Sequence, residues 1–136
     1  MLAILIIGLV LIITFIAIFI FIDFKKREVK HHKKTKHYVV IKKKEKKRKK
    51  VKVIELSSKE TSQNKKNIKL SKNPDKTNPE PSYVIPVVRN RNLDDIEKSK
   101  KPMYISHKDL KITDEIYNDH LKNIEELENG RKKKKK

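Results

Sequence analysis

The chain begins with MLAILIIGLVLIITFIAIFIFIDFKKR (residues 1–27), an apolar run that ends in a cluster of charges. No charged side chain occurs from Met1 to Ile22. As an α-helix this run would span roughly 33 Å, against about 30 Å for the hydrocarbon core of a bilayer. A soluble helix of this length normally keeps one polar side for water. The run therefore predicts a transmembrane helix over residues 1–22.

A cleaved signal peptide is the alternative interpretation of the same run. Such a peptide starts with basic residues and ends in small residues at the cleavage site. Here no Lys or Arg precedes the run, and its exit reads FIFIDFKK (residues 19–26). We therefore expect an uncleaved anchor.

The basic flank predicts the orientation of this anchor. Residues 23–56 contain sixteen Lys or Arg against four acids, and basic residues beside a span stay on the cytoplasmic side. We expect the amino terminus outside or lumenal and the carboxyl terminus inside. Lys133 and Lys134 look like a dilysine retrieval signal, which makes the endoplasmic reticulum a candidate location, with a virion membrane as another.

The remainder of the chain is strongly basic. The whole protein has a net charge of +19 and a sequence pI near 10.0, and its apolar residues after the span come in short clusters between lysine runs. High charge with few apolar residues favours disorder. The predicted fold class is a single-pass transmembrane α-helix followed by a largely extended or disordered basic tail with one short amphipathic C-terminal helix.

Composition divides this tail into segments. Residues 37–41 and 51–56 have the β-branched content of short strands. Pro86 restricts SYVIPVV (residues 82–88) to an edge strand or a polyproline-like stretch. The expected segments are a juxtamembrane polybasic segment (23–56), a linker (57–81), extended apolar strips (82–105), an acidic amphipathic helix region (106–129) and a polylysine tail (130–136).

The amphipathic helix is expected near residues 114–129, with Thr113 as its N-cap and Gly130 as its C-terminal stop. Its apolar residues share one arc at helical spacing. Because little else in the tail could cover this arc, we expect it to bind a partner protein, although folding back on residues 83–105 remains open. The expected partner-binding residues are Ile116, Tyr117, Leu121, Ile124 and Leu127.

Two lysine-rich runs are the expected contacts for anionic lipids of the inner leaflet and for other polyanions, including non-specific nucleic acid. Lysine binds phosphate as a point charge, so this binding should be blind to sequence and sensitive to salt. The residues are Lys25, Lys26, Arg27, Lys30, Lys33, Lys34, Lys36, Lys42, Lys43, Lys44, Lys46, Lys47, Arg48, Lys49 and Lys50.

No motif in the sequence indicates catalysis, a metal or a cofactor. Cysteine is absent, two glycines cannot form a glycine-rich phosphate loop, and lysines surround His31, His32 and His37. The sequence predicts a non-enzymatic, membrane-anchored structural or adaptor protein whose basic inner-face tail attaches a partner protein to a membrane. The alternative is a virion membrane protein that tethers capsid or nucleic acid through its polybasic tail.

Overall fold

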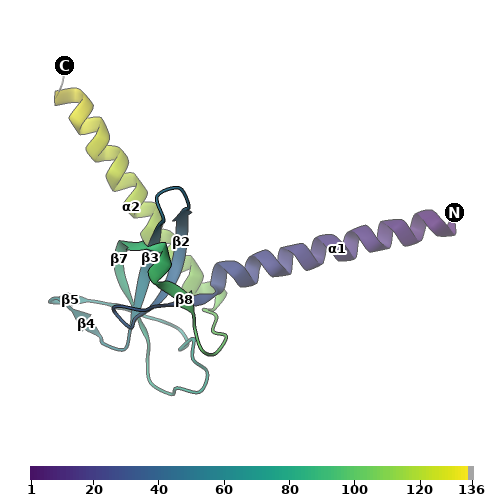
Figure 1. Ribbon diagram of the computed structural model, residues 1–136, viewed down its shortest axis with the longest axis horizontal. Helices are drawn as coiled ribbons and strands as arrows, with labels where there is room; N and C mark the ends of the chain where they lie inside the picture. Colours follow the sequence, from purple (N-terminus) through teal and green to yellow (C-terminus); the bar gives the residue numbers. More distant parts are fainter. Residues whose placement is uncertain (135–136) are drawn as a thin grey trace.

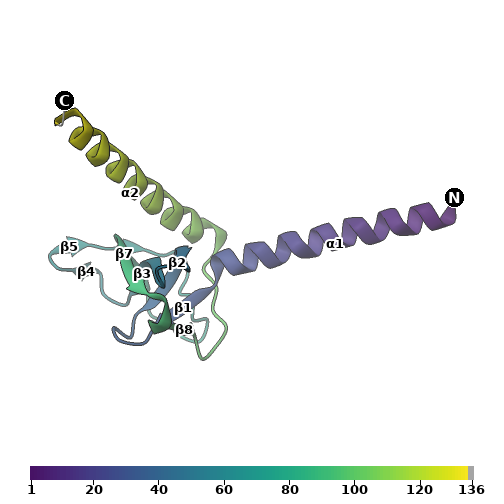
Figure 2. The same ribbon diagram turned by 45° about the horizontal axis from the view of Figure 1, so that its top comes forward.

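Two long helices leave a β domain in different directions (Figures 1 and 2). The computed structural model describes residues 1–134. Helix α1 spans Leu2–Arg27, and helix α2 spans His107–Lys134. Between them lie a six-stranded sheet and a small two-stranded one. The expectation of an extended or disordered tail with one short helix is therefore wrong.

The main sheet is antiparallel throughout, with the strand order β6-β7-β3-β2-β1-β8. The smaller sheet is the hairpin β4–β5, whose turn places Gln63 and Asn64 at positive φ. The strands are β1 (Val29–His32), β2 (Tyr38–Glu45), β3 (Lys50–Ser57), β4 (Thr61–Ser62), β5 (Lys65–Lys66), β6 (Ile68–Lys69), β7 (Tyr83–Asn92) and β8 (Ile96–Lys98).

The apolar clusters of the sequence form this sheet by pairing with one another. In the register, Val40 lies opposite Ile54, and Ile54 lies opposite Val88. Strands β2 and β3 occupy the two places where short strands were expected, and both are longer. Each apolar cluster is too small to form a core alone, but pairing across the sheet buries them together.

Helix α2 covers one face of the sheet, which we call the helix face. Its core is apolar and includes residues from four strands together with Met103 and Ile105. Leu110, Ile116 and Tyr117 of α2 pack against this core. The buried members are Val29, Val40, Ile54, Leu56, Leu70, Val84, Met103 and Ile105.

The opposite face, which we call the cavity face, has a smaller core of Val39, Val51 and Val53. After β7 the chain crosses this face through the 3-10 helix η1 (Leu93–Asp95) and reaches the far edge of the sheet as β8. Leu93 and Ile96 pack on the small core during this crossing. The remainder of this face opens into a cavity.

Residues 57–81, expected to be a linker, contain β4, β5, β6 and an ordered loop. Side chains hold the loop: the Asp75 amide donates to Asn73 Oδ1 at 2.9 Å, and the Glu80 amide donates to Asn78 Oδ1 at 3.0 Å. The loop is tied to α2 where Ser71 donates from its amide and hydroxyl to the buried Asp109, both at 2.9 Å. These local hydrogen bonds replace a hydrophobic core in ordering a polar segment.

Pro86 lies inside β7, in the middle of a bulge. Between the pairs Ile54–Val88 and Leu56–Val84, three residues of β7 face one residue of β3. The bulge accommodates a residue that lacks an amide donor. On its other side, β7 pairs with β6 at Tyr83 and Val84.

Helix α2 begins earlier and ends later than expected. Ser106 caps its start, because the Asp109 amide donates to Ser106 Oγ at 3.2 Å. Thr113 is fully buried inside the helix and donates its hydroxyl to the Leu110 carbonyl at 2.7 Å. Gly130 lies within the helix with open space around it. The expected N-cap and the expected C-terminal stop are therefore both wrong.

Candidate functional site

The end of α1 is joined directly to the β domain. Arg27 donates to the Ile105 carbonyl at 3.2 Å, and its own carbonyl accepts from the Ile105 amide at 2.9 Å. The Phe24 ring packs edge-on against Tyr104 with centroids 5.1 Å apart, and His107 lies 2.9 Å from Asp23. Helix α1 is long and apolar enough to cross a membrane, and none of its residues is buried. The junction fixes this helix relative to the start of α2.

The structure divides the expected partner-binding residues into two groups. Ile116 and Tyr117 pack against the core of the helix face and so contact this chain itself. Leu121 and Leu127 are 42% and 67% exposed on the distal half of α2, and Ile124 is half-buried between them. This half extends beyond the sheet (Figures 1 and 2). The alternative that the helix folds back on its own chain therefore holds only for its first half.

The expected polyanion-binding residues also separate into groups. Lys25 and Lys26 are exposed at the end of α1, and Lys33, Lys34 and Lys36 are exposed near the β1–β2 turn. A third group forms the tip of the β2–β3 hairpin, which we call the hairpin tip. Its exposed members are Lys43, Lys44, Lys46, Lys47, Arg48 and Lys49.

Several of these cations have partners within the chain. Lys30 pairs with Glu28 at 2.9 Å, and Lys50 donates to Asn92 at 2.5 Å. Lys42 departs most from the expectation, because a bulge after Ile41 turns it toward α2. Its side chain is 5% exposed and binds Asp114 at 2.6 Å. Burial lowers the pKa of Lys42, and Asp114 opposes that shift. Lys42 is therefore a structural cation.

The three clustered histidines point to separate partners. His31 binds Glu97 at 2.8 Å, His32 binds Thr35 at 2.8 Å, and His37 lies 3.2 Å from the Leu56 carbonyl. The hydrogen bond from His31 lowers the pKa of Glu97. Within residues 1–134, no group of three or more acidic, histidine or cysteine side chains is placed to hold a metal ion.

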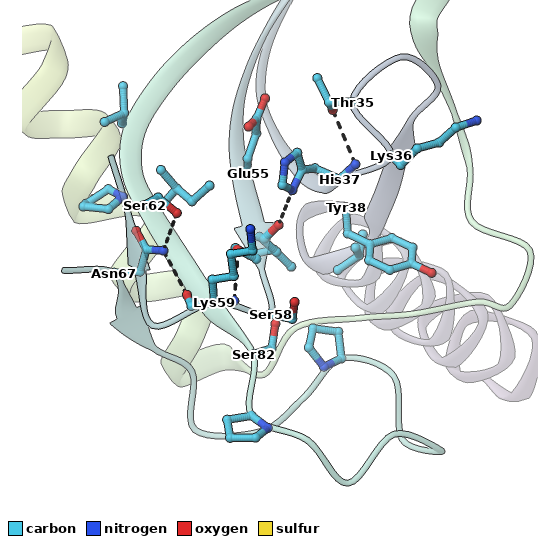
Figure 3. A pocket seen from close by; sticks show the side chains of 18 of the residues that line it. Thr35, Lys36, His37, Tyr38, Glu55, Ser58, Lys59, Ser62, Asn67 and Ser82 are labelled. Atoms are coloured by element: carbon cyan, nitrogen blue, oxygen red, sulfur yellow. Dashed lines mark hydrogen bonds between the residues drawn. The ribbon is translucent and has the colours of Figure 1, made fainter. Parts of the chain in front are cut away.

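A cavity of about 1030 Å³ opens on the cavity face (Figure 3). Its lining also includes Val29, Leu56 and Met103 from the core of the helix face. One wall comes from the start of β2 and the end of β3, and another from the bulged part of β7. The β4–β5 hairpin and the ordered 71–82 loop enclose the other sides. The size is at the upper end of the range for small-molecule sites.

An ion pair between a buried carboxylate and a half-buried arginine lies at the wall of this cavity. Glu55, whose side chain is 6% exposed, accepts hydrogen bonds from Nε and Nη2 of Arg91, with Nε at 2.9 Å. His32 is buried nearby, and its pKa is lowered first by burial and then by the charge of Arg91, while Asp95 and Glu55 oppose the shift. The wall therefore combines a carboxylate held by Arg91 with a second arginine, Arg89.

The cavity was missed at the level of sequence because its residues come from five separate segments. A local signal existed in SKNPDKTNPEPS (residues 71–82), where Asn-Pro occurs twice before an acid. These are turn signals, so an ordered loop could have been inferred there. No local pattern could have placed Glu55 beside Arg91.

Comparison with family models, with curated proteins and with solved structures found no match to this chain.

Proposed function

We propose that this protein is a non-enzymatic, single-pass membrane adaptor. The first helix anchors it, with the amino terminus outside or lumenal and the β domain inside. The distal half of α2 (residues 121–134) then attaches a partner protein to the membrane. The observation that carries this proposal is the pair of exposed leucines, Leu121 and Leu127, on a helix that extends beyond its own domain.

The junction supports an anchor that is kept after synthesis. Asp23, Phe24 and Arg27 contact the segment that leads into α2. Cleavage after Phe24 would remove two of these three residues, Asp23 and Phe24, from the contact. The exposed Lys25 and Lys26 support the inside location of the domain, because basic residues beside a span stay on the cytoplasmic side.

The chemistry of the distal helix indicates the kind of partner. Around the apolar stripe, residues 118–129 carry four exposed acids and one cation, Lys122, and the cations of the last turn follow from Arg131 onward. The acids are Asp119, Glu125, Glu126 and Glu128. An amphipathic helix of this type fits an apolar groove, read through anchors at helical spacing. The partner we propose is a protein whose apolar groove has a basic rim.

The test replaces Leu121 and Ile124 together with Asp in the full-length protein. Both lie beyond the packed half of α2, so the fold should be kept while co-purification of the partner in mild detergent is lost. The matched control is Asn118→Asp with Asn123→Asp, two exposed substitutions that add the same charge to the same helix. Equal recovery of the same proteins by both variants would refute the docking role.

The alternative function, tethering of capsid or nucleic acid in a virion, is favoured by the hairpin tip. Six exposed cations gather there on one short ribbon. Nuclease treatment during purification distinguishes the two functions, because a protein partner should remain and a nucleic acid should not. Replacing Lys46, Lys47, Arg48 and Lys49 with Gln should weaken salt-sensitive polyanion binding while sparing the helix-bound partner.

A further inference from the structure

The outer side of β7 has no strand beside it over most of its length. In the sheet, β7 lies between β3 and the two-residue strand β6, which pairs with it only at Tyr83 and Val84. Within residues 1–134, no other strand continues along residues 85–92 on that side. Figures 1 and 2 both place β7 on the side of the domain away from α1, so the anchor helix does not cover it.

The register shows which backbone groups of β7 are free. The Leu93 amide donates to the Lys49 carbonyl of the neighbouring strand at 2.9 Å. Because hydrogen-bonded positions alternate along antiparallel strands, Arg89 and Arg91 also direct their backbone groups toward β3. Residues 88, 90 and 92 therefore direct their amide and carbonyl groups outward.

Residues 88–92 of β7, which we call the open edge, are accessible to a further strand. Val88 packs against the core of the helix face, whereas Asn90 and Asn92, which follow on the same face, are exposed beyond the cover of α2. An exposed edge with free amides and carbonyls can pair with an extended segment of another chain.

The charges along the open edge distinguish between possible occupants. Arg89 and Arg91 lie on it, Lys50 and Lys52 lie opposite it on β3, and these parts of the two strands contain no acid. Glu55 binds Arg91, but Arg89 takes part in none of the ion pairs formed within residues 1–134. A second copy of this edge would bring arginine next to arginine, which is unfavourable, whereas an acidic strand would bring opposite charges together.

We propose that the open edge binds an extended acidic segment of a partner protein as an additional antiparallel strand. Backbone hydrogen bonds to residues 88, 90 and 92 provide the affinity, and acids at alternate positions lie beside Arg89 and Arg91 on the cavity face. This surface is separate from the distal half of α2, whose partner presents a groove rather than an extended chain. The inference therefore does not depend on the proposed docking role of α2.

The test uses the full chain in phosphatidylcholine nanodiscs and a fluorescein-labelled peptide, Thr-Glu-Thr-Glu-Thr-Glu-Thr, with binding followed by fluorescence polarisation at about 150 mM salt. In the proposed pairing, the Thr amides face β7 and the Glu amides face away from it. N-methylation of two Thr amides should abolish binding. N-methylation of two Glu amides, which keeps the same composition and charge, should leave binding unchanged.

Variants of the protein test the same geometry from the other side. Asn90→Pro removes an outward amide that β3 does not use, so the sheet should remain while binding weakens about tenfold or more. Asn90→Thr keeps this amide and should bind as the wild type does. Arg89→Gln should weaken binding about two- to fivefold, whereas Arg48→Gln, which removes the same charge from the hairpin tip, should not.

Hydrogen exchange of the wild type, resolved by residue with NMR spectroscopy, gives a measurement that needs no variant. In the free protein the amides of residues 88, 90 and 92 should exchange faster than those of residues 89 and 91, and the peptide should protect them. Leu121→Asp with Ile124→Asp should leave peptide binding unchanged, which separates this test from that of the distal helix.

Binding that requires both the Thr amides of the peptide and the amide of Asn90 supports the proposal. Equal binding of the two N-methylated peptides, or equal effects of Arg89→Gln and Arg48→Gln, would overturn it, because any acidic chain would then bind through charge alone. Association of the protein with itself that Asn90→Pro abolishes would also overturn it, and would make a second copy of the chain the occupant of the open edge.

Discussion

The two faces of the sheet are closed to different degrees. The helix face buries eight apolar residues under α2, and its buried Asp109 and Thr113 both have hydrogen-bond partners. The cavity face buries three valines under the η1 crossing and then opens into a cavity with two unsatisfied polar atoms at its wall. Complete burial with complete hydrogen bonding is typical of a stabilising core, whereas an open polar wall is typical of a binding site.

This difference predicts that most of the stability of the β domain comes from the helix face. Ile54 lies at its centre, fully buried, between Val40 on β2 and Val88 on β7. Ile54→Ala should lower the free energy of unfolding by about 2–5 kcal/mol, from lost burial and from the space left behind. Urea unfolding of the detergent-solubilised protein measures this change.

Ile54→Val is the graded control and should cost about 0.5–1.5 kcal/mol. If Ile54→Ala lowers the free energy of unfolding by less than about 2 kcal/mol, α2 does not hold the helix face closed. The helix face would then not be the source of most of the stability.

Adjacent valines on β2 give the sharpest comparison of the two faces. Val40 belongs to the core of the helix face and Val39 to that of the cavity face, and both are fully buried. Each Val→Ala change removes two methylene equivalents, or about 1.6 kcal/mol of burial. Val40→Ala should cost more than Val39→Ala, because the larger and fully covered core relaxes less into the space. Equal costs in matched urea titrations would show that the two cores are equally rigid.

Local pattern predicted the elements of this fold better than their assembly. The uncharged run of α1, the β-branched clusters of β2 and β3 and the periodicity of α2 are all visible within short windows of sequence. The sheet was missed because its pairings join residues that are far apart in the chain, such as Ile54 and Val88. Each apolar cluster of the sequence is too small to form a core alone, and the lysines between the clusters favoured a prediction of disorder.

The ends of α2 were predicted wrongly and the cavity was not predicted, both because they depend on tertiary packing. Thr113 has the chemistry of an N-cap, but packing against the sheet extends the helix back to Ser106, whose side chain then caps it. Sequence alone could not choose between these two residues. The cavity arises from tertiary contact, and its unsatisfied atoms on Arg89 and Asn67 become visible only when every hydrogen bond is accounted for.

The smallest predicted effect concerns the pH dependence of the cavity face. His32 is 3% exposed, and its Nδ1 accepts a hydrogen bond from the Thr35 amide at 3.1 Å. Protonation at Nδ1 would remove this acceptor. Burial lowers the pKa of His32, and the charges of Arg91 and Lys34 lower it further, against Asp95 and Glu55.

Because the pKa of His32 is lower in the folded state than in the unfolded chain, the unfolded chain binds the proton more readily. The stabilisation from neutral His32 is therefore present above the unfolded pKa, near 6.5, and is lost as the pH falls from there toward the folded value. We expect the free energy of unfolding to decrease as the pH is lowered from 7 through this range. His32→Asn, which keeps an acceptor but does not titrate, should remove this part of the pH dependence.

The control is Val40→Ala, which should lower the free energy of unfolding by the same amount at every pH, because no titratable group is changed on the helix face. If His32→Asn and the wild type lose stability in parallel as the pH falls, another group carries the pH dependence, and the cavity face differs from the helix face in its openness alone.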